Sequence, residues 1–196
     1  MSLPLQGELD LRLHPVVRPE RLFFAVMPDA AAARAIARIG QTLCEADPAA
    51  PKPIRQERLH VSTHFVCDWP RLKARRVMAA RLAGAAVRLP PFDLALRAAM
   101  TFEPFGSRSE AQRPLVLVGE AVGVSELQAA LAAAMGARRP GPKRSGLPHV
   151  TLCYGARPVA QRPIPPIAWT AREFVLLHSR QDQPHYDVLG RWPLGA

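Results

Sequence analysis

Leu59-His60-Val61-Ser62-Thr63 and Pro148-His149-Val150-Thr151-Leu152 are two segments of this sequence that share one pattern. Each places a histidine two residues before a hydroxyl side chain, within an apolar run typical of a β-strand. Residues two apart on a strand point to the same face and lie about 6–7 Å apart. We therefore expect each histidine to share a strand face with its hydroxyl, so that both side chains can reach one bound group.

The chemistry of these side chains fits a phosphodiester. Breaking such a bond requires one group that takes a proton from the attacking oxygen and another that protonates the leaving oxygen. Histidine, with a pKa near ~6.5, can serve in either role. The hydroxyls of Ser62 and Thr151 can donate hydrogen bonds to the nonbridging oxygens as charge develops. The two triplets thus predict catalysis by His60 and His149, although a single triplet of this kind is more typical of a structural position.

We expect no metal and no cofactor. The sequence has no His-x-x-x-His or Cys-x-x-Cys spacing and no carboxylate cluster near either histidine to complete a metal site. Its three cysteines, Cys44, Cys67 and Cys153, leave one unpaired under any disulfide scheme, which is typical of a reducing compartment. We therefore expect a cytoplasmic protein. Neither a signal peptide nor a membrane-spanning run is evident.

Composition predicts a globular chain with a polyanionic partner. The 196 residues are 48% hydrophobic, and 26 Lys and Arg against 16 Asp and Glu give a net charge of +10. Such a charge attracts polyanions, with nucleic acid the first candidate, but it also serves solubility alone. We expect a polar extension over residues 1–20, a single domain over 21–196, and a monomer.

Hydrophobic periodicity predicts an α+β fold. The expected strands cover residues 21–27, 58–66, 92–97, 114–119, 147–154, 171–179 and 186–194, and a proline-rich link precedes the last two. The expected helices cover 29–46, with Asp29 as N-cap, 69–87, and 125–135, where Ser125 and Gln128 match a capping box. Strand alternation places His64 on the face of His60 and Phe65 on the opposite face.

The sequence resembles the RNA 2′,3′-cyclic phosphodiesterase family, also called 2′-5′ RNA ligases, within the two-histidine phosphoesterase superfamily. The resemblance covers nearly the whole chain after about residue 20 and rests on segments that occur in the family's order. These segments are Arg21–Val26, Leu59–Val66, Pro148–Leu152, and the closing hairpin of Phe174–Ser179 with Tyr186–Leu194.

This resemblance implies a bilobal fold in which two antiparallel sheets with outer helices are related by a pseudo-twofold axis around a central cleft. It also implies that the protein opens RNA 2′,3′-cyclic phosphate ends to 2′-phosphates. His149 would then be the base for the attacking water and His60 the acid toward the 3′ oxygen, with Ser62 and Thr151 as phosphate ligands. The reverse reaction, with a 5′-hydroxyl in place of water, would be 2′-5′ RNA ligation.

The chain departs from the family pattern at three positions. Ser62 replaces the usual threonine, Cys67 a common glycine, and Tyr154 stands where many members have an arginine. The phosphate contact of that arginine would pass to another basic residue, and Tyr154 itself could stack a terminal base. The candidate basic residues are Arg157, Arg144 and Lys143.

Two alternatives remain open from the sequence. One is an RNA-binding module without chemistry, which the charge and the missing arginine favour. The other is the same fold acting on a small cyclic nucleotide or another phosphodiester.

Overall fold

A computed structural model of the chain describes residues 20–46, 52–103, 113–136, 147–155, 157–180 and 183–195. The predicted N-terminal extension lies outside these ranges except for Glu20, which begins the first strand.

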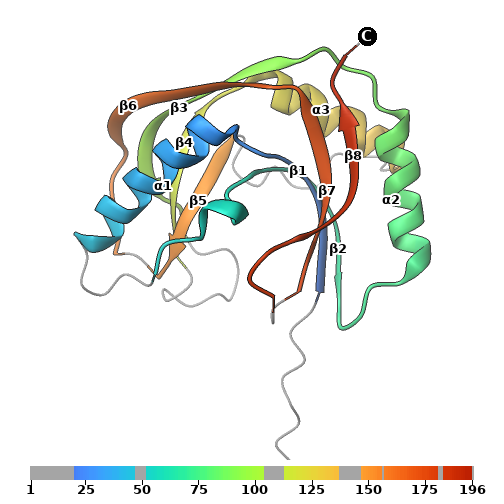
Figure 1. Cartoon of the computed structure of the whole chain (residues 1–196), viewed down its shortest axis with the longest axis horizontal. Coiled ribbons are helices and arrows are strands. Elements are labelled where there is room, and N and C mark those ends of the chain that lie inside the picture. Colours follow the sequence, from blue (N-terminus) through green and yellow to red (C-terminus); the bar gives the residue numbers. More distant parts are fainter. Residues whose placement is uncertain are drawn as a thin grey trace, which may run out of the picture.

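Eight strands and three α-helices form within the described residues, and Figure 1 shows the helices arranged around the outside of the strands. In chain order the elements are β1 (Glu20–Val26), α1 (Ala30–Glu45), the 3₁₀ turn η1 (Gln56–Arg58), β2 (Val61–Trp69), α2 (Ala74–Ala86), β3 (Phe92–Thr101), β4 (Pro114–Glu120), α3 (Val122–Ala134), β5 (His149–Tyr154), β6 (Arg162–Ala171), β7 (Glu173–Ser179) and β8 (Asp187–Pro193).

The strands form one antiparallel sheet in the order β6-β3-β4-β5-β2-β1-β7-β8. Its two halves, β6-β3-β4-β5 and β2-β1-β7-β8, are joined by a single residue pair, Val61 with Val150. The predicted α+β fold is confirmed, and the two sheets expected from the resemblance are the halves of this continuous sheet. Each half contains a strand-helix-strand unit, β1-α1-β2 or β4-α3-β5, whose last strand continues one of the two triplets.

Helices α1 and α3 tie the halves together, because each contacts strands of the opposite half. Helix α1 connects two strands of one half and contacts β5 and β6 of the other, whereas α3 connects β4 to β5 and contacts β2 as well as β3. Ile36 of α1, Ala80 of α2 and Leu127 of α3 are buried in the same main core, which fills the space between the helices and one face of the sheet. Burying this apolar surface is the main stabilising contribution to the fold.

The opposite face of the sheet, here called the inner face, carries two small hydrophobic clusters to which no helix contributes. The first contains Phe23, Ala25, Val175 and Leu177 from β1 and β7. The second contains Ala98, Val116 and Val118 from β3 and β4. Each half of the sheet therefore has its own hydrophobic cluster on the inner face.

The helix boundaries differ from two of the predictions. Asp29 caps α1 as predicted, because its carboxylate accepts a hydrogen bond from the Ala32 N–H at 2.8 Å. The predicted capping box is wrong, because α3 begins at Val122 and Ser125 lies inside it. The second helix begins at Ala74 rather than at Trp69, which is the last residue of β2.

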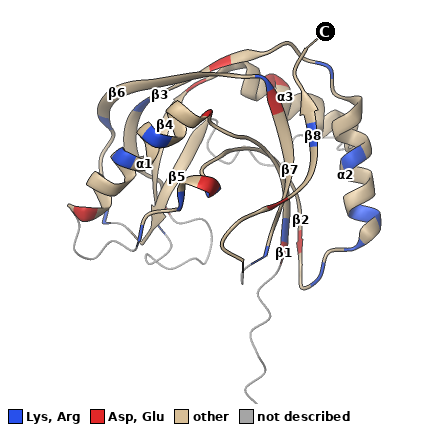
Figure 2. Cartoon of the chain, in the orientation of Figure 1, with Lys and Arg blue, Asp and Glu red and all other residues tan. Residues whose placement is uncertain are grey.

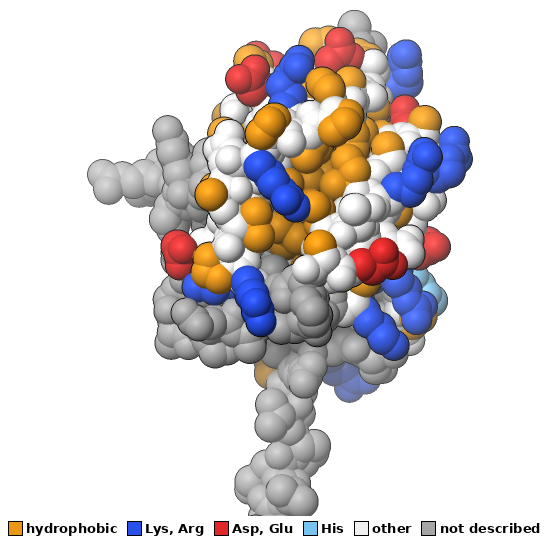
Figure 3. Space-filling model, turned by 90° about the vertical axis from the view of Figure 1, so that its left-hand side faces the viewer, with side chains coloured by type: hydrophobic (Ala, Val, Ile, Leu, Met, Phe, Trp, Pro, Cys, Tyr) orange, Lys and Arg blue, Asp and Glu red, His pale blue; other side chains and the backbone are white. Residues whose placement is uncertain are grey.

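The proline-rich segment predicted as a link is partly a strand, β6 (Arg162–Ala171). It contains Pro163, Pro165 and Pro166 and forms one edge of the sheet. Proline lacks an N–H, but an edge strand can lose donors on its unpaired side. Figure 3, which views the molecule from the side where β6 and α1 lie, shows hydrophobic side chains gathered there between basic and acidic ones.

The first triplet also begins differently from the prediction. Arg58 ends the η1 turn, and β2 starts only at Val61, so His60 lies immediately before the strand rather than within it. None of the helices in the described ranges is both long and apolar enough to span a membrane.

Gly119 of β4 provides a test of how the fold supports the second histidine. Its N–H donates to the Pro148 carbonyl at 3.1 Å, next to His149, and a Cβ at this position would overlap the backbone carbonyl of Ala95. We expect Gly119→Ala to lower the free energy of unfolding by about 1–3 kcal/mol, because the backbone of β3 or β4 must move.

Urea unfolding followed by circular dichroism measures this change. Gly195→Ala is the matched control, because an added Cβ there meets nothing within 4 Å. We expect it to change the stability by less than about 0.5 kcal/mol. Equal stability of the two variants would contradict the close approach of β3 and β4.

Candidate active site

The four predicted site residues lie around the one pair that joins the halves of the sheet. Val61 and Val150 are buried in the main core between sheet and helices. Because neighbouring residues of a strand point to opposite faces, the residues on either side of each valine point to the inner face. These residues are His60, Ser62, His149 and Thr151. The antiparallel direction sets each histidine opposite the hydroxyl of the other strand.

His60 packs on the inner-face hydrophobic cluster of its own half. Its ring centroid is 5.1 Å from that of Phe23 and 5.4 Å from that of Tyr186, which meets it edge-on. Its Nδ1 is 2.8 Å from the Arg58 carbonyl oxygen, and its Nε2 is 3.1 Å from Ser62 Oγ. The predicted pairing of histidine and hydroxyl within the triplet is therefore present as a direct contact.

His149 has the equivalent surroundings in the other half. Its ring meets Phe102 edge-on at a centroid distance of 4.9 Å, and Phe102 packs on the second inner cluster. Its Nδ1 is 3.0 Å from the Leu147 carbonyl oxygen. Each histidine thus contacts an aromatic ring of its own half and the carbonyl two residues before it.

These carbonyl contacts determine which ring nitrogen carries the proton. A carbonyl oxygen only accepts, so Nδ1 of both His60 and His149 must be the N–H donor. In the neutral ring this leaves the lone pair on Nε2, and at His60 that nitrogen accepts from the Ser62 hydroxyl. Both histidines are therefore held with Nε2 as the nitrogen that can gain or lose a proton.

Burial lowers the pKa of both histidines. The pKa of His60 falls from 6.5 to about 4, chiefly because burial disfavours the charged ring; the Arg58 carbonyl opposes this fall, and the positive charges of His149 and Arg58 add to it. Burial also lowers the pKa of His149, against a smaller opposing contribution from the Leu147 carbonyl. Both rings are consequently neutral near pH 7, and the charge of His149 is a minor contribution to the lowered pKa of His60.

A bulge in β2 changes the face of the residues that follow the first hydroxyl. Ser62 pairs with Ala25 and His64 with Phe24, so Thr63 is an extra residue without a partner on β1. His64 consequently lies on the helix-covered face with Phe24, and Phe65 lies on the inner face with Phe23. The predictions for His64 and Phe65 were therefore wrong, because an unbroken alternation was assumed.

A second bulge brings Tyr154 to the inner face. On β5, Thr151 pairs with Val116 and Cys153 with Leu115, which leaves Leu152 as the extra residue. Tyr154 is 45% exposed and Phe65 is 48% exposed. Each of these aromatic residues thus lies three positions after its hydroxyl, on the same face as that hydroxyl. The family's arginine position is therefore on the site side of β5, as the resemblance requires, although a tyrosine occupies it.

Two site residues were missed from the sequence. The Arg58 guanidinium lies over the Tyr186 ring, with Cζ 4.4 Å from its centroid, and Tyr186 in turn contacts Phe23 and His60. Burial raises the pKa of Tyr186, and the charge and hydrogen bond of Arg58 oppose that rise. The sequence signal for Arg58 is its position beside the triplet, and Tyr186 is marked only as the first residue of the closing hairpin in the family resemblance.

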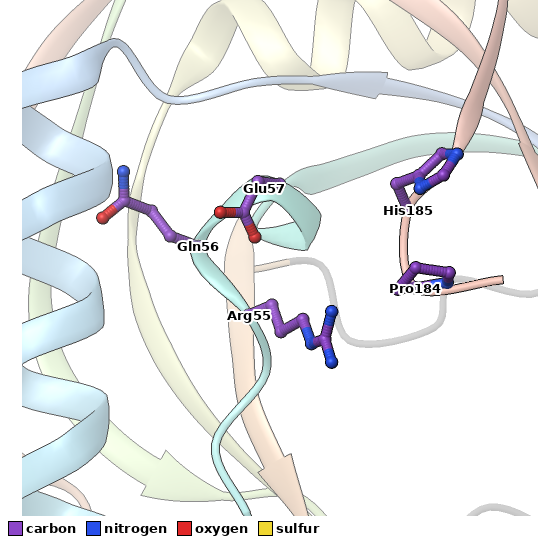
Figure 4. A pocket seen from close by; sticks show the side chains of 5 residues that line it. All are labelled: Arg55, Gln56, Glu57, Pro184 and His185. Carbon is purple, nitrogen blue, oxygen red and sulfur yellow. The ribbon is translucent and has the colours of Figure 1, made fainter.

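A pocket of about 410 Å³ lies next to this cluster. It is lined by Arg55, Gln56 and Glu57 at η1 and by Pro184 and His185 from the connection between β7 and β8, and Figure 4 shows these two segments on opposite sides of it. In the sequence, Arg58 comes directly after Glu57 of one wall, and Tyr186 comes directly after His185 of the other. Their stacking contact therefore joins the walls of the pocket beside His60.

The three basic residues predicted to replace the family arginine remain predictions. Arg144 and Lys143 lie outside the described residues. Arg157 is exposed in the segment between β5 and β6. Within the described ranges, no three His, Cys, Asp or Glu side chains form a cluster that could hold a metal ion.

Comparisons with known proteins identify the family and the fold of the chain. The family model of the 2′-5′ RNA ligase superfamily matches residues 27–183. Escherichia coli LigT complexed with 3′-AMP is 26% identical, with 91% of this chain and 99% of that chain covered and a TM-score of 0.67. LigT complexed with phosphate gives 26% identity, the same coverage and a TM-score of 0.66.

The protein TT0787 of Thermus thermophilus shares the fold at 24% identity and a TM-score of 0.67, over 89% of this chain and 97% of that one. No curated protein matches the chain significantly. The match to the family model, together with two histidine triplets on one inner face, shows that this chain belongs to the 2′-5′ RNA ligase superfamily and has the two-histidine phosphoesterase fold.

Proposed function

We propose that this protein hydrolyses 2′,3′-cyclic phosphate ends of RNA to 2′-phosphates without a metal, and that the same site supports reversible 2′-5′ ligation. The observation that carries the proposal is that both histidines have the same hydrogen-bonding arrangement. Each is held by a backbone carbonyl at Nδ1, which leaves Nε2 for proton transfer on the inner face. One reaction step needs two such groups, one to accept a proton and one to donate it.

In the proposed step, water attacks the phosphorus and the bond to the 3′ oxygen breaks. Nε2 of His149 accepts the proton of the water, and protonated Nε2 of His60 donates its proton to the 3′ oxygen. The product is a 2′-phosphate with a free 3′-hydroxyl, and proton exchange with solvent restores both rings. For ligation, a 5′-hydroxyl replaces water and the phosphate remains bonded to both strands.

The hydrogen bond between His60 and Ser62 links the proton to the phosphate ligand. While Nε2 of His60 is unprotonated, the Ser62 hydroxyl donates its hydrogen to it at 3.1 Å. Once Nε2 carries a proton, that hydroxyl hydrogen is released and can turn toward a nonbridging phosphate oxygen. Thr151 offers a second hydroxyl from the other strand, so that charge on the phosphate is stabilised from both halves.

The distribution of charge gives less support to an RNA-binding module without chemistry. Figure 2 shows basic residues on α1 and α2 as well as near the inner strands, so the net charge of +10 is not confined to the site. A protein that only binds RNA has no need of two half-buried, neutral histidines whose Nε2 atoms are left for proton transfer. Salt-dependent RNA binding with no turnover of any cyclic phosphate would nevertheless favour that alternative.

The first test replaces each histidine. We expect His60→Ala and His149→Ala each to lower kcat/KM on a cyclic-phosphate oligonucleotide by about 10²–10⁴-fold, because each removes one proton-transfer group. The assay contains a chelator and resolves 2′- from 3′-phosphate products. His64→Ala is the matched control, since this ring faces the helices, and it should retain activity. Full activity in both histidine variants contradicts the proposal.

The second test is the pH dependence. The free enzyme is active when one histidine is protonated and the other neutral, a form that peaks between the two pKa values of the pair. Both values lie below 6.5, so we expect kcat/KM to rise as the pH falls below neutrality and to decline again near pH 4. An optimum above pH 7.5, about one unit beyond the usual histidine pKa, would contradict the proposed pair.

Proton NMR titration of the imidazole rings checks the same pair directly. In His149→Ala the repulsion from the second ring disappears, so the pKa of His60 should rise above its value of about 4. It should remain below 6.5, because burial is the larger cause of the shift. An unchanged pKa would show that the two histidines do not interact.

A further inference from the structure

Two arginines extend toward one point on the inner face of the half that carries His60. The Arg58 Nη2 donates to Ser179 Oγ at 3.3 Å, and its guanidinium is stacked on Tyr186. Ser179 of β7 stands directly opposite Arg21 of β1. Residues paired across neighbouring strands share a face, so Arg21 also projects to the inner face at Ser179.

The position at Ser179 where the two arginines converge lies about two strand residues from Phe23, which contacts His60. Phe23, which contacts His60, is two residues from Arg21, and the register between β1 and β7 is unbroken from Arg21 to Ala25. Two residues of a strand span about 6–7 Å. The Tyr186 ring contacts both Arg58 and His60. The two arginines therefore lie beside His60 on the inner face, joined to it through the rings of Tyr186 and Phe23.

Within the described part of the chain, neither Arg58 nor Arg21 forms an ion pair, although Asp68 stands opposite Arg21 on β2. Two nearby carboxylates are engaged elsewhere. Glu20 contacts His178 Nε2 at 3.1 Å, and Asp187 pairs with Arg180 at 2.8 Å.

We propose that Arg58 and Arg21, with Ser179, bind the phosphate that joins the terminal nucleotide of the substrate to the preceding one. A guanidinium presents a planar fork of donors that matches phosphate oxygens, and stacking on Tyr186 fixes its plane. The neighbouring pocket of about 410 Å³ provides room for the preceding nucleoside. This inference rests on the proposed function, and it identifies the substrate as an RNA end of two or more nucleotides rather than a free cyclic nucleotide.

The experiment compares a nucleoside 2′,3′-cyclic phosphate, which lacks the second phosphate, with a dinucleotide that ends in the same cyclic phosphate. We expect the wild-type protein to have a kcat/KM about 10–100-fold higher on the dinucleotide, the usual effect of a hydrogen-bonded charge. Arg58→Met should reduce this preference to within about threefold of unity, and Arg58→Lys should retain part of it, because the charge remains without the fork.

Two further variants make the comparison independent of any folding defect. Arg34→Met is the matched control, because it removes the same charge from the exposed side of α1 and should keep the wild-type preference. Arg21→Met changes the second cation and should lower the preference separately. Binding of a longer RNA should also become less sensitive to salt in Arg58→Met, with a slope of log K against log salt reduced by about 0.7.

The outcomes separate the subsite from the proposed function. A wild-type protein that converts both substrates equally well, or an Arg58→Met variant that keeps the full dinucleotide preference, overturns the subsite alone. Equal losses on both substrates in Arg58→Met would place Arg58 on the reacting phosphate and also overturn it. A wild-type protein that converts neither substrate contradicts the proposed function itself.

Discussion

The pairing of Val61 with Val150 is the contact on which the site depends. Among the described residues it is the one ladder pair between the strands of the two halves, and the predicted catalytic side chains flank it. Because both valines point into the core, their neighbours must point to the inner face. One ladder pair is a weak connection by itself. The helices that cross between the halves, α1 and α3, supply the buried surface that keeps the two strands together.

Much of this arrangement could be predicted from local sequence patterns. Within each triplet, the histidine and the hydroxyl were expected to share a face because a two-residue repeat in an apolar segment is typical of strands. Asp29 was predicted as a cap by its position before the periodic apolar residues of α1. The β6 strand was missed because its prolines are typical of a link, and only its position at the sheet edge makes them compatible with pairing.

The surroundings of the histidines could not be predicted in this way. Arg58 and Tyr186 are far apart in the sequence and meet only because the connection between β7 and β8 returns to the η1 turn. No periodicity or composition marks such a contact. The low pKa of His60 likewise arises chiefly from burial, and its ring contacts Phe23 and Tyr186, which are distant in the sequence, so the residue type alone gives no sign of it.

The bulges after Ser62 and Thr151 determine which of the following residues point to the inner face. An extra residue follows Ser62 on β2 and another follows Thr151 on β5. Each bulge shifts the alternation by one residue. The residues on the inner face are therefore the histidine, the hydroxyl residue two positions after it, and the aromatic residue three positions after the hydroxyl. The three-residue interval between the hydroxyl and the aromatic residue is therefore set by the backbone. It occurs in both halves and does not depend on which side chain stands at its last position. A sequence with the same residue types at regular two-residue intervals would present Phe65 and Tyr154 to the helices instead of to the site.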